Sequence, residues 1–290
     1  MKYINLKARA KINPALDVLG IRDDGYHELR MIMQTVNLCD NIFIKTENSN
    51  DIILSANVPW LPTDERNLMY KAAALMKERY GINHGISMDL TKRIPVAAGL
   101  AGGSTDCAAV IVGLNRLFEL NLSLKEQLAI GKELGADVPY CIMRGTMLAE
   151  GIGDKLTRLA PFPDCYVLLC KPNINVSTAT VYQSIDNCGI EVHPDIDTMI
   201  KNIEAGDLKA VCDCMCNVLE NVTVNNYPII ADIKAKMLEL GAVGSMMSGS
   251  GPTVFGFFNA YEPALEALKE VRRIFRTREV YVTTIFNERQ

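Results

Sequence analysis

The sequence predicts an α+β fold. Long strand-like and long helix-like runs both occur, and they do not follow the regular strand–helix–strand alternation of a parallel α/β protein. The chain contains no internal repeat and no low-complexity tract. Its 290 residues, 49% of them hydrophobic, are enough to bury a sizeable core and suggest one large domain or two ordinary ones.

Four strands and one helix are expected before residue 95. Residues 3–13 alternate in polarity, which is typical of a strand with one buried face. A helix is expected to begin near Thr63 or Asp64 and to run to Tyr80, with Gly81 as its C-terminal cap. Further strands are expected at 41–46, 51–55 and 86–90.

The remaining elements follow a segment rich in glycine and alanine. An apolar helical run covers residues 107–117, and Ser123 with Glu126 forms a capping box that opens a helix ended by Gly135. The tripeptide Pro161-Phe162-Pro163 is the expected junction between two domains. Strands are expected at 146–150, 165–170, 253–258 and 279–285, and helices near 197–204, 207–220, 228–240 and 262–274.

Composition argues against several classes of function. A net charge of −4 makes a large polyanion such as nucleic acid an unexpected partner. The basic N-terminal residues lack the apolar core of a signal peptide, and no apolar run approaches the ~20 residues of a membrane span. Nine cysteines, an odd count, are typical of reduced thiols in a cytoplasmic protein.

A C-x-C-x-C pattern, Cys212 to Cys216, invites interpretation as a metal site. The surrounding segment is helix-like, so Cys214 should point away from the other two thiols. No C-x-x-C pair and no paired histidines accompany them. Buried helix cysteines are therefore expected, and no metal is assigned to them.

The segment from Pro95 to Thr105, here called the glycine loop, is the first sign of chemistry. It follows a strand-like run and precedes a helical one, so small residues would let the backbone approach an anion at a helix N-terminus. The loop contains no lysine and matches neither the G-x-x-x-x-G-K-[ST] nor the G-x-G-x-x-G motif. Nucleotide binding is the first hypothesis, and a tight strand-to-helix connection is the alternative.

Three segments together resemble the motifs of the GHMP kinase superfamily. They are Lys11-Ile12-Asn13, the glycine loop, and residues 248–256. Other local matches are Gly25-Tyr26-His27, Arg66-Asn67-Leu68, Gly135 to Pro139, and Ser177-Thr178-Ala179 followed by Val181-Tyr182. The resemblance covers nearly the whole chain. It implies a two-domain α+β fold with an N-terminal ATP-binding domain (1–160), a C-terminal GHMP kinase domain (161–290), and an active site in the cleft between them.

The resemblance implies a reaction in the synthesis of isoprenoid precursors by the non-mevalonate route. ATP would phosphorylate the 2-hydroxyl of a methylerythritol that carries cytidine diphosphate. Mg²⁺ is expected to arrive with ATP, with Ser104 or Thr105 able to touch it, because no acidic cluster indicates a protein-built metal site. The residues expected to bind ATP are Asn67, Pro95, Val96, Ala97, Ala98, Gly99, Leu100, Ala101, Gly102, Gly103, Ser104 and Thr105.

Lys11 and Asp137 match the superfamily's catalytic lysine and aspartate. An alcohol is a poor nucleophile at neutral pH, so a carboxylate near its proton helps the reaction. A lysine beside that carboxylate would keep it ionised and stabilise charge on the reacting oxygens. Without the resemblance, Lys11 would be interpreted as part of a solvated basic strip and Asp137 as a helix N-cap.

The remaining expected contacts are to the cytidine substrate. Tyr26 offers a ring on which a base can stack, and the side chain or backbone of His27 can bond the polar edge of that base. A tight turn with a half-buried tyrosine is the alternative there. The full set expected to bind substrate is Lys11, Asn13, Tyr26, His27, Asp137, Thr178, Tyr182, Gly249 and Gly251.

Two other functions stay open. One is phosphorylation of another small alcohol, homoserine or mevalonate, which needs no aromatic platform such as Tyr26. The other is a non-catalytic nucleotide-binding regulator, which the presence of both Lys11 and Asp137 disfavours. The protein is expected to act as a monomer or weak homodimer on a small molecule, without a membrane or nucleic acid.

The sequence departs from the superfamily pattern at three positions. Ala101 stands where many such loops have glycine, and we expect a negative φ there because alanine avoids the left-handed region. Val218 replaces an acid that the resemblance would place there. Cys107, just after the glycine loop, would be sensitive to thiol reagents if it were exposed.

Overall fold

A computed structural model describes residues 2–287, apart from the side chain of Cys188, and it contains the expected mixture of helices and sheets. The chain forms two compact units, each built from separate stretches of sequence. Unit 1 contains the residues up to Ala10, Cys39–Val96 and Ala101–Met143, and unit 2 contains Lys11–Leu38, Ala97–Leu100 and the residues from Arg144 onward. The domain boundary at 160/161 stays a prediction, and residues 1 and 288–290 at the domain ends lie outside the described residues.

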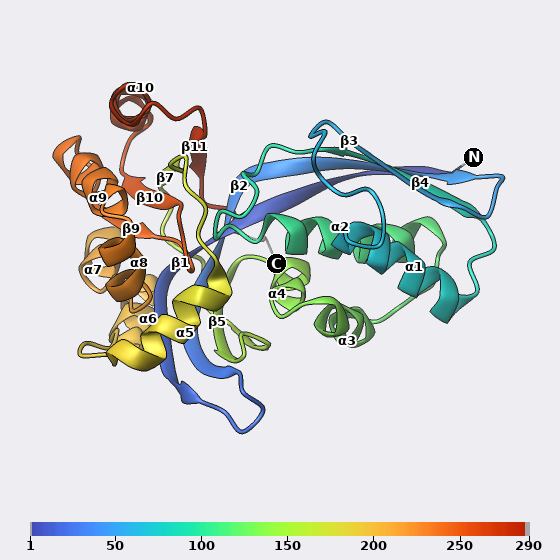
Figure 1. Ribbon diagram of the computed structural model, residues 1–290, viewed down its shortest axis with the longest axis horizontal. Helices are drawn as coiled ribbons and strands as arrows, with labels where there is room; N and C mark the ends of the chain where they lie inside the picture. The colour runs from blue at the N-terminus through green and yellow to red at the C-terminus, as the bar shows by residue number, and fades with distance from the viewer. Residues whose placement is uncertain (1, 288–290) are drawn as a thin grey trace. The chain divides into compact units, whose positions relative to one another are not determined.

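Unit 1 is a sheet with helices on one side (Figure 1). Its strands are the first part of β1 (Tyr3–Ile21), the last part of β2 (His27–Glu47), β3 (Ile52–Ala56) and β4 (Gly85–Thr91). Strand β4 pairs antiparallel with β2 and parallel with β3. The helices are α1 (Leu68–Tyr80), α2 (Gly102–Leu117), α3 (Leu124–Leu134) and α4 (Val138–Met143). Helix α2 packs against the other three and is largely buried.

Local signals in the sequence set most helix ends in this unit. Gly81 adopts a left-handed φ of 62° after α1, and the Ser123–Glu126 capping box opens α3, as predicted. The expected start of α1 near Thr63 or Asp64 is wrong. Helix α1 begins at Leu68, because the Asn67 side chain accepts a hydrogen bond from the Met69 amide and so acts as the N-cap.

Unit 2 combines the other parts of β1 and β2 with a separate four-stranded sheet. Strand β5 (Thr146–Gly151) pairs with β2 and with β6 (Lys155–Arg158), and β8 (Cys216–Asn217) pairs with β1. The second sheet has the order β11-β7-β10-β9, formed by Val280–Thr284, Tyr166–Cys170, Val254–Phe258 and Gly244–Met247. Helices α9 (Ile229–Glu239) and α10 (Tyr261–Phe275) pack against this sheet.

The remaining helices of unit 2 show where the sequence prediction fails. They are α5 (Thr178–Cys188), α6 (Ile196–Glu204), α7 (Leu208–Asp213) and α8 (Glu220–Asn226). The single helix expected over 207–220 is wrong: α7 ends at Asp213, and Cys216 and Asn217 form strand β8 before α8 begins. Strand β1 runs to Ile21, well past residue 13, because Ala10 to Val18 are buried on both faces and show no alternation.

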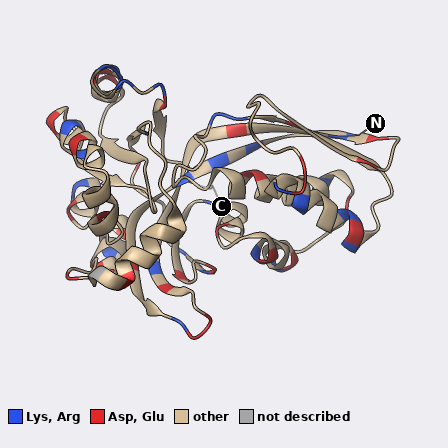
Figure 2. Ribbon diagram, viewed as in Figure 1, with Lys and Arg blue, Asp and Glu red and all other residues tan. Residues whose placement is uncertain are grey.

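The cysteine pattern forms no metal centre among residues 2–287, where no group of three potential ligands occurs. Cys212 ends up buried on α7, while Cys214 caps that helix and Cys216 lies on β8. No helix within the described range is long and apolar enough to cross a membrane. In the ribbon of Figure 2, basic (blue) and acidic (red) residues alternate along α3 and α10, in keeping with the small net charge of −4.

Candidate active site

Unit 2 brings parts of all three sequence motifs together. The Lys11 amide donates to the Leu100 carbonyl (3.2 Å), and the Ser248 hydroxyl donates to the Gly99 carbonyl (3.0 Å). A side chain on Gly99 would collide with the Ser248 carbonyl, since its Cβ would lie 2.2 Å from that oxygen. Glycine at position 99 is therefore required by close approach as well as by its φ of 74°.

Lys11 is a buried lysine, with only 6% of its surface exposed. Its Nζ donates to the Asn13 Oδ1 (2.6 Å), and a Cβ on Gly249 would lie 3.4 Å from the same Nζ. Within the described part of unit 2, this amide oxygen is its one hydrogen-bond acceptor. The burial rules out the solvated basic strip, and Asn13, fully buried in the middle of β1, is not a polar strand end.

The loop containing Gly249 is fixed by two side chains that the sequence analysis did not select. The Asn217 amide group donates to the Met247 carbonyl (2.9 Å) and the Gly249 carbonyl (2.8 Å). Glu220 accepts from the Met247 amide (2.7 Å). Val218, in place of the acid, is buried and contributes only its backbone to β1. The short strand β8 thus positions the Asn217 side chain to hydrogen-bond the loop.

The centre of the glycine loop has an unusual backbone. Ala97 and Ala101 both have positive φ, 51° and 55°. The expectation of a negative φ at Ala101 is therefore wrong, since alanine occupies the left-handed position directly before α2. The cost for a non-glycine residue is about 1–2 kcal/mol, small enough for the packed loop to outweigh. Pro95, Ala98 and Leu100 are buried, whereas Ala97 is exposed.

The rest of the glycine loop opens α2 in unit 1. Gly102, Gly103, Ser104 and Thr105 form the first turn of this 16-residue helix, and Thr105 N donates to the Ala101 carbonyl (2.9 Å). The first amides of a helix have no partner within it and carry the positive end of its dipole. Gly103 is exposed and Ser104 half-buried. This helix end has the chemistry of a phosphate site.

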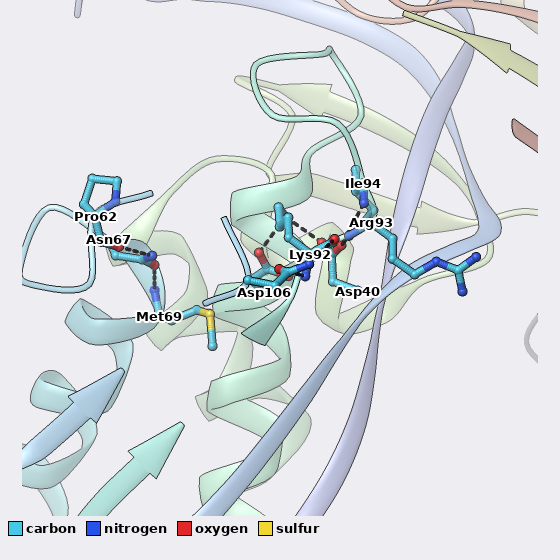
Figure 3. A network of polar contacts seen from close by, with 9 residues as sticks. Asp40, Pro62, Asn67, Met69, Lys92, Arg93, Ile94 and Asp106 are labelled. Carbon is cyan, nitrogen blue, oxygen red and sulfur yellow. Dashed lines mark hydrogen bonds and ion pairs between the residues drawn. The ribbon is translucent and has the colours of Figure 1, made fainter. Parts of the chain in front are cut away.

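A buried ion cluster lies beside that helix end (Figure 3). The Lys92 Nζ donates to the Asp40 Oδ2 (2.5 Å) and the Asp106 Oδ2 (2.7 Å), and the three side chains are 5%, 0% and 4% exposed. The Asp40 Oδ1 accepts from the amides of Arg93 (2.5 Å) and Ile94 (2.8 Å). We call Asp40, Lys92 and Asp106 the lysine–aspartate cluster.

The cluster changes the protonation of its members. Burial raises the pKa of Asp106 well above its usual value, and the neighbouring Asp40 carboxylate adds to this against the opposing Lys92. Burial alone would lower the pKa of Lys92, but the two carboxylates outweigh it and the pKa of the ammonium is raised. The Asp106 Oδ1 is buried and has no hydrogen-bond partner among the described residues. Lys92 therefore stays charged, and Asp106 holds a proton more readily than an ordinary carboxyl.

Asn67 and Asp137, both in unit 1, lie at helix starts. The Asn67 amide group bridges the Pro62 carbonyl (2.7 Å) and the Met69 amide (2.9 Å), as Figure 3 shows. Asp137 directly precedes α4, and its side chain is half-buried. Lys11 belongs to the other unit, so its pairing with Asp137 stays a prediction.

The cytidine contacts expected from the sequence cluster around His27 in unit 2. The His27 ring lies 4.8 Å from the Tyr182 ring between centroids, and its Nε2 bonds the Asp186 Oδ1 (2.7 Å). Tyr182 and Asp186 lie one turn apart on α5, so a single helix face holds the imidazole. Tyr26 is 62% exposed in the adjoining turn. Asp186 had no signal in the sequence.

Thr178 and Cys107 complete the residues singled out from the sequence. The Thr178 hydroxyl bonds the Ser250 hydroxyl (2.8 Å), which places the start of α5 beside the loop between Gly249 and Gly251. Cys107 is fully buried in α2, and burial raises the pKa of its thiol to about 12. The condition for sensitivity to thiol reagents, an exposed Cys107, is therefore not met.

Comparisons with known proteins agree with this arrangement. The family model "GHMP kinases N terminal domain" matches residues 67–145, and "GHMP kinases C terminal" matches residues 199–277. A 4-diphosphocytidyl-2-C-methyl-D-erythritol kinase from Lachnospira eligens is 51% identical over 286 residues, 99% of this chain and 99% of that protein. A crystal structure of 4-(cytidine 5'-diphospho)-2C-methyl-D-erythritol kinase superposes with a TM-score of 0.84 at 29% identity, covering 98% of this chain and 100% of that one.

A mevalonate kinase from L. major superposes with a TM-score of 0.76 at 14% identity, covering 100% of this chain and 98% of that one, a likeness of fold alone. The fold and the matches define a kinase that transfers phosphate to an alcohol group. The chain belongs to the GHMP kinase family. The fold class expected from the sequence is thereby confirmed, and membership of this family implies the use of ATP.

Proposed function

We propose that the chain transfers the γ-phosphoryl group of ATP to the 2-hydroxyl of 4-diphosphocytidyl-2-C-methyl-D-erythritol, a step in non-mevalonate isoprenoid precursor synthesis. The observation that carries this proposal is the 51% identity, over 99% of both chains, to a protein named as that kinase. Homoserine and mevalonate are the alternative substrates. The distant likeness to mevalonate kinase does not favour them, because it extends to the fold only.

In the proposed reaction, the Asp137 carboxylate accepts the proton of the substrate hydroxyl. The hydroxyl oxygen forms a bond to the γ-phosphorus as the bond between that phosphorus and the bridging oxygen of ADP breaks. Lys11 stabilises the charge on the transferring group. This role suits a buried ammonium that donates one hydrogen bond to the Asn13 Oδ1. Its other two N–H groups can donate to phosphate oxygens.

The glycine loop is proposed to hold the phosphates of ATP. Backbone amides from Ala97 to Ser104 and the positive end of α2 supply the attraction, in place of a lysine within the loop. The Thr105 amide already donates to the Ala101 carbonyl. Asn67 is proposed to lie near the adenine. Its fixed amide group would present the same edge to every nucleotide.

We propose that Mg²⁺ comes bound to ATP. The two carboxylates of the lysine–aspartate cluster, Asp40 and Asp106, already share Lys92 and are buried, so they do not suit a hydrated ion. Ser104, half-buried in the first turn of α2, is the better hydroxyl ligand, since Thr105 is buried. The ion would neutralise charge on the phosphates.

The cytidine end is proposed to bind at His27. Tyr26 would stack on the cytosine, and His27, held by Tyr182 and Asp186, would bond its polar edge. Asn13, Thr178, Gly249 and Gly251 would contact the remainder of the substrate. We also propose a cytoplasmic enzyme that works as a monomer or weak homodimer, without nucleic acid or membrane.

The test is ATP-dependent phosphorylation measured with the cytidine substrate, homoserine and mevalonate in parallel. We expect turnover of the cytidine substrate alone, and Asp137→Ala should reduce it by about 10²–10⁴, the usual contribution of a positioned base. Phosphorylation of homoserine or mevalonate without the cytidine compound would reject the proposed substrate. Turnover by Asp137→Ala within about threefold of wild type would reject the proposed base.

A further inference from the structure

We propose that Lys92 is a positioning residue for the nucleotide. Through Asp40 and Asp106, it fixes the backbone at the two ends of the glycine loop, both of which belong to unit 1. The proposal rests on the proposed binding of ATP phosphates at that loop. The lysine–aspartate cluster lies wholly in unit 1, and its members come from the second half of strand β2, the segment after β4, and helix α2.

At the start of the loop, the cluster fixes the backbone. Asp40 accepts hydrogen bonds from two consecutive amides, Arg93 and Ile94, directly before Pro95. Its second oxygen accepts from the Lys92 Nζ at 2.5 Å. Lys92 is also held by its backbone, which exchanges two hydrogen bonds with the Asn57 side chain (2.7 and 3.2 Å). This end of the loop therefore has little freedom to move.

At the end of the loop, the same ammonium reaches α2. It donates to Asp106 at 2.7 Å, and it lies so close to Gly102 that a Cβ there would be 2.9 Å from the Nζ. Gly102 is the first residue of α2, so Lys92 supports the turn whose amides face the proposed phosphates. One ammonium thus connects the residues before the loop to the helix after it.

The charges of the cluster explain why Lys92 is not itself a phosphate ligand. Its side chain is 5% exposed, and both of its acceptors are carboxylates of this chain. Lys92 and Asp40 are the charged groups that act on Asp106, while Cys107 beside it is uncharged because burial raises its pKa to about 12. The Lys92 ammonium is therefore already bonded to Asp40 and Asp106 and is not available to a bound phosphate.

The test compares two variants that differ only at position 92. Asp106→Asn keeps an acceptor for the Lys92 Nζ, and Lys92→Met combined with Asp106→Asn removes the ammonium and one of its two carboxyl partners. ATP affinity is measured by calorimetry without the alcohol substrate, and folding by circular dichroism and thermal melting. We expect Asp106→Asn to bind ATP within about threefold of wild type, and the double variant to bind it at least about tenfold more weakly.

Kinetics separate positioning from general damage. In the double variant the KM for ATP should rise by about tenfold or more, while the KM for the cytidine substrate changes by less than about threefold. If the double variant does not fold, Asp106→Leu takes its place, because it keeps the Lys92–Asp40 pair and breaks only the link to α2. It should weaken ATP binding relative to Asp106→Asn.

Two results overturn the proposal. One is a folded variant that lacks the Lys92–Asp106 link and still binds ATP with wild-type affinity. The other is an equal rise in KM for ATP and for the cytidine substrate. The proposed function fails by a different result. A wild-type protein that binds ATP and does not phosphorylate the cytidine substrate would reject that function, and calorimetry with ATP would still decide the role of Lys92.

Discussion

Lys11 in unit 2 and Lys92 in unit 1 are both buried lysines, but their partners differ. Lys92 lies between two carboxylates, each within hydrogen-bond distance of its ammonium. Lys11 donates to a neutral amide oxygen, that of Asn13, and packs beside Gly249. Within its own unit, Lys92 has two carboxylates opposite its charge and Lys11 has a neutral amide, and this difference separates a residue that shapes the protein from one that is suited to act on phosphate.

The difference follows from the cost of burying charge. An ammonium removed from water loses hydration, and opposite charges nearby restore part of that loss. At Lys92 the protein supplies the opposite charge itself. At Lys11 the described residues of unit 2 supply only a dipole, so an anionic ligand would provide the compensation and gain binding energy from it.

The largest expected effect is on stability, at Lys92. Lys92→Met should destabilise the protein by about 3–5 kcal/mol, because it leaves two buried carboxyl groups without their cation. The free energy of unfolding, measured by urea denaturation, checks this. A loss below about 1 kcal/mol would mean that the cluster is better hydrated than its burial indicates.

Lys11→Met should give the reverse pattern. Turnover should fall by about 10²–10³, the usual effect of removing one donor to the charge that forms in the transition state. The free energy of unfolding should change by no more than about 1 kcal/mol, since the cost of the unpaired Asn13 oxygen is offset by removing a buried charge. Steady-state kinetics and urea denaturation of the same preparation measure both. Near-normal turnover by Lys11→Met would contradict the proposed role of Lys11 in stabilising the transferring phosphoryl group.

A smaller effect is expected from pH at Asp106. Its raised pKa means that the folded protein keeps a proton that the unfolded chain releases above an ordinary pKa of 3.8. The contribution of this group to stability is therefore fully present below that value and is lost as the pH rises through the raised pKa. Asp106→Asn should remove this part of the pH dependence. Thermal melting of wild type and Asp106→Asn across a range of pH tests the direction of this change. A wild type that becomes more stable relative to Asp106→Asn as the pH rises would contradict it.

The smallest effect is expected at Cys107. Its thiol is buried with a pKa of about 12, so an alkylating reagent at neutral pH should leave it unmodified in the folded protein. Half-buried Cys39 is the internal control and should be modified first. Mass spectrometry of digested protein reports both sites. Rapid modification of Cys107 together with loss of activity would show that the start of α2 opens readily.

The sequence predicted the fold where short-range signals decide it. Gly81 and the Ser123–Glu126 capping box set their helix ends through contacts within a few residues. The prediction failed where distant contacts decide. Asn217 reads as part of a helix, but its hydrogen bonds to Met247 and Gly249 hold it in a short strand. The predicted length of β1 was too short for a related reason, because a strand buried on both faces has no alternation of polar and apolar residues.

The same distinction holds for the site. Lys11, Asn13 and the glycine loop were found through motifs, and unit 2 brings Lys11 and Asn13 together with Gly99 and Gly249. The lysine–aspartate cluster was not found. Asp40 lies 52 residues from Lys92 in the sequence, and nothing near either residue indicates a buried ion pair. Asp40 and Lys92 are brought together only by the packing of β2 against the segment before the glycine loop.

The position of the Lys92 ammonium beneath Gly102 bears on how relatives should be recognised. Alanine is accepted at position 101 despite a φ of 55°, whereas at position 102 an added methyl group would meet the ammonium at 2.9 Å. The demand for glycine at 102 thus comes from its neighbours, the Lys92 ammonium and the Ile94 Cγ2 at 3.2 Å, and not from the backbone conformation. A search pattern for this loop should therefore allow alanine at 101 and weight glycine at 102 most strongly in chains that have lysine ten residues earlier.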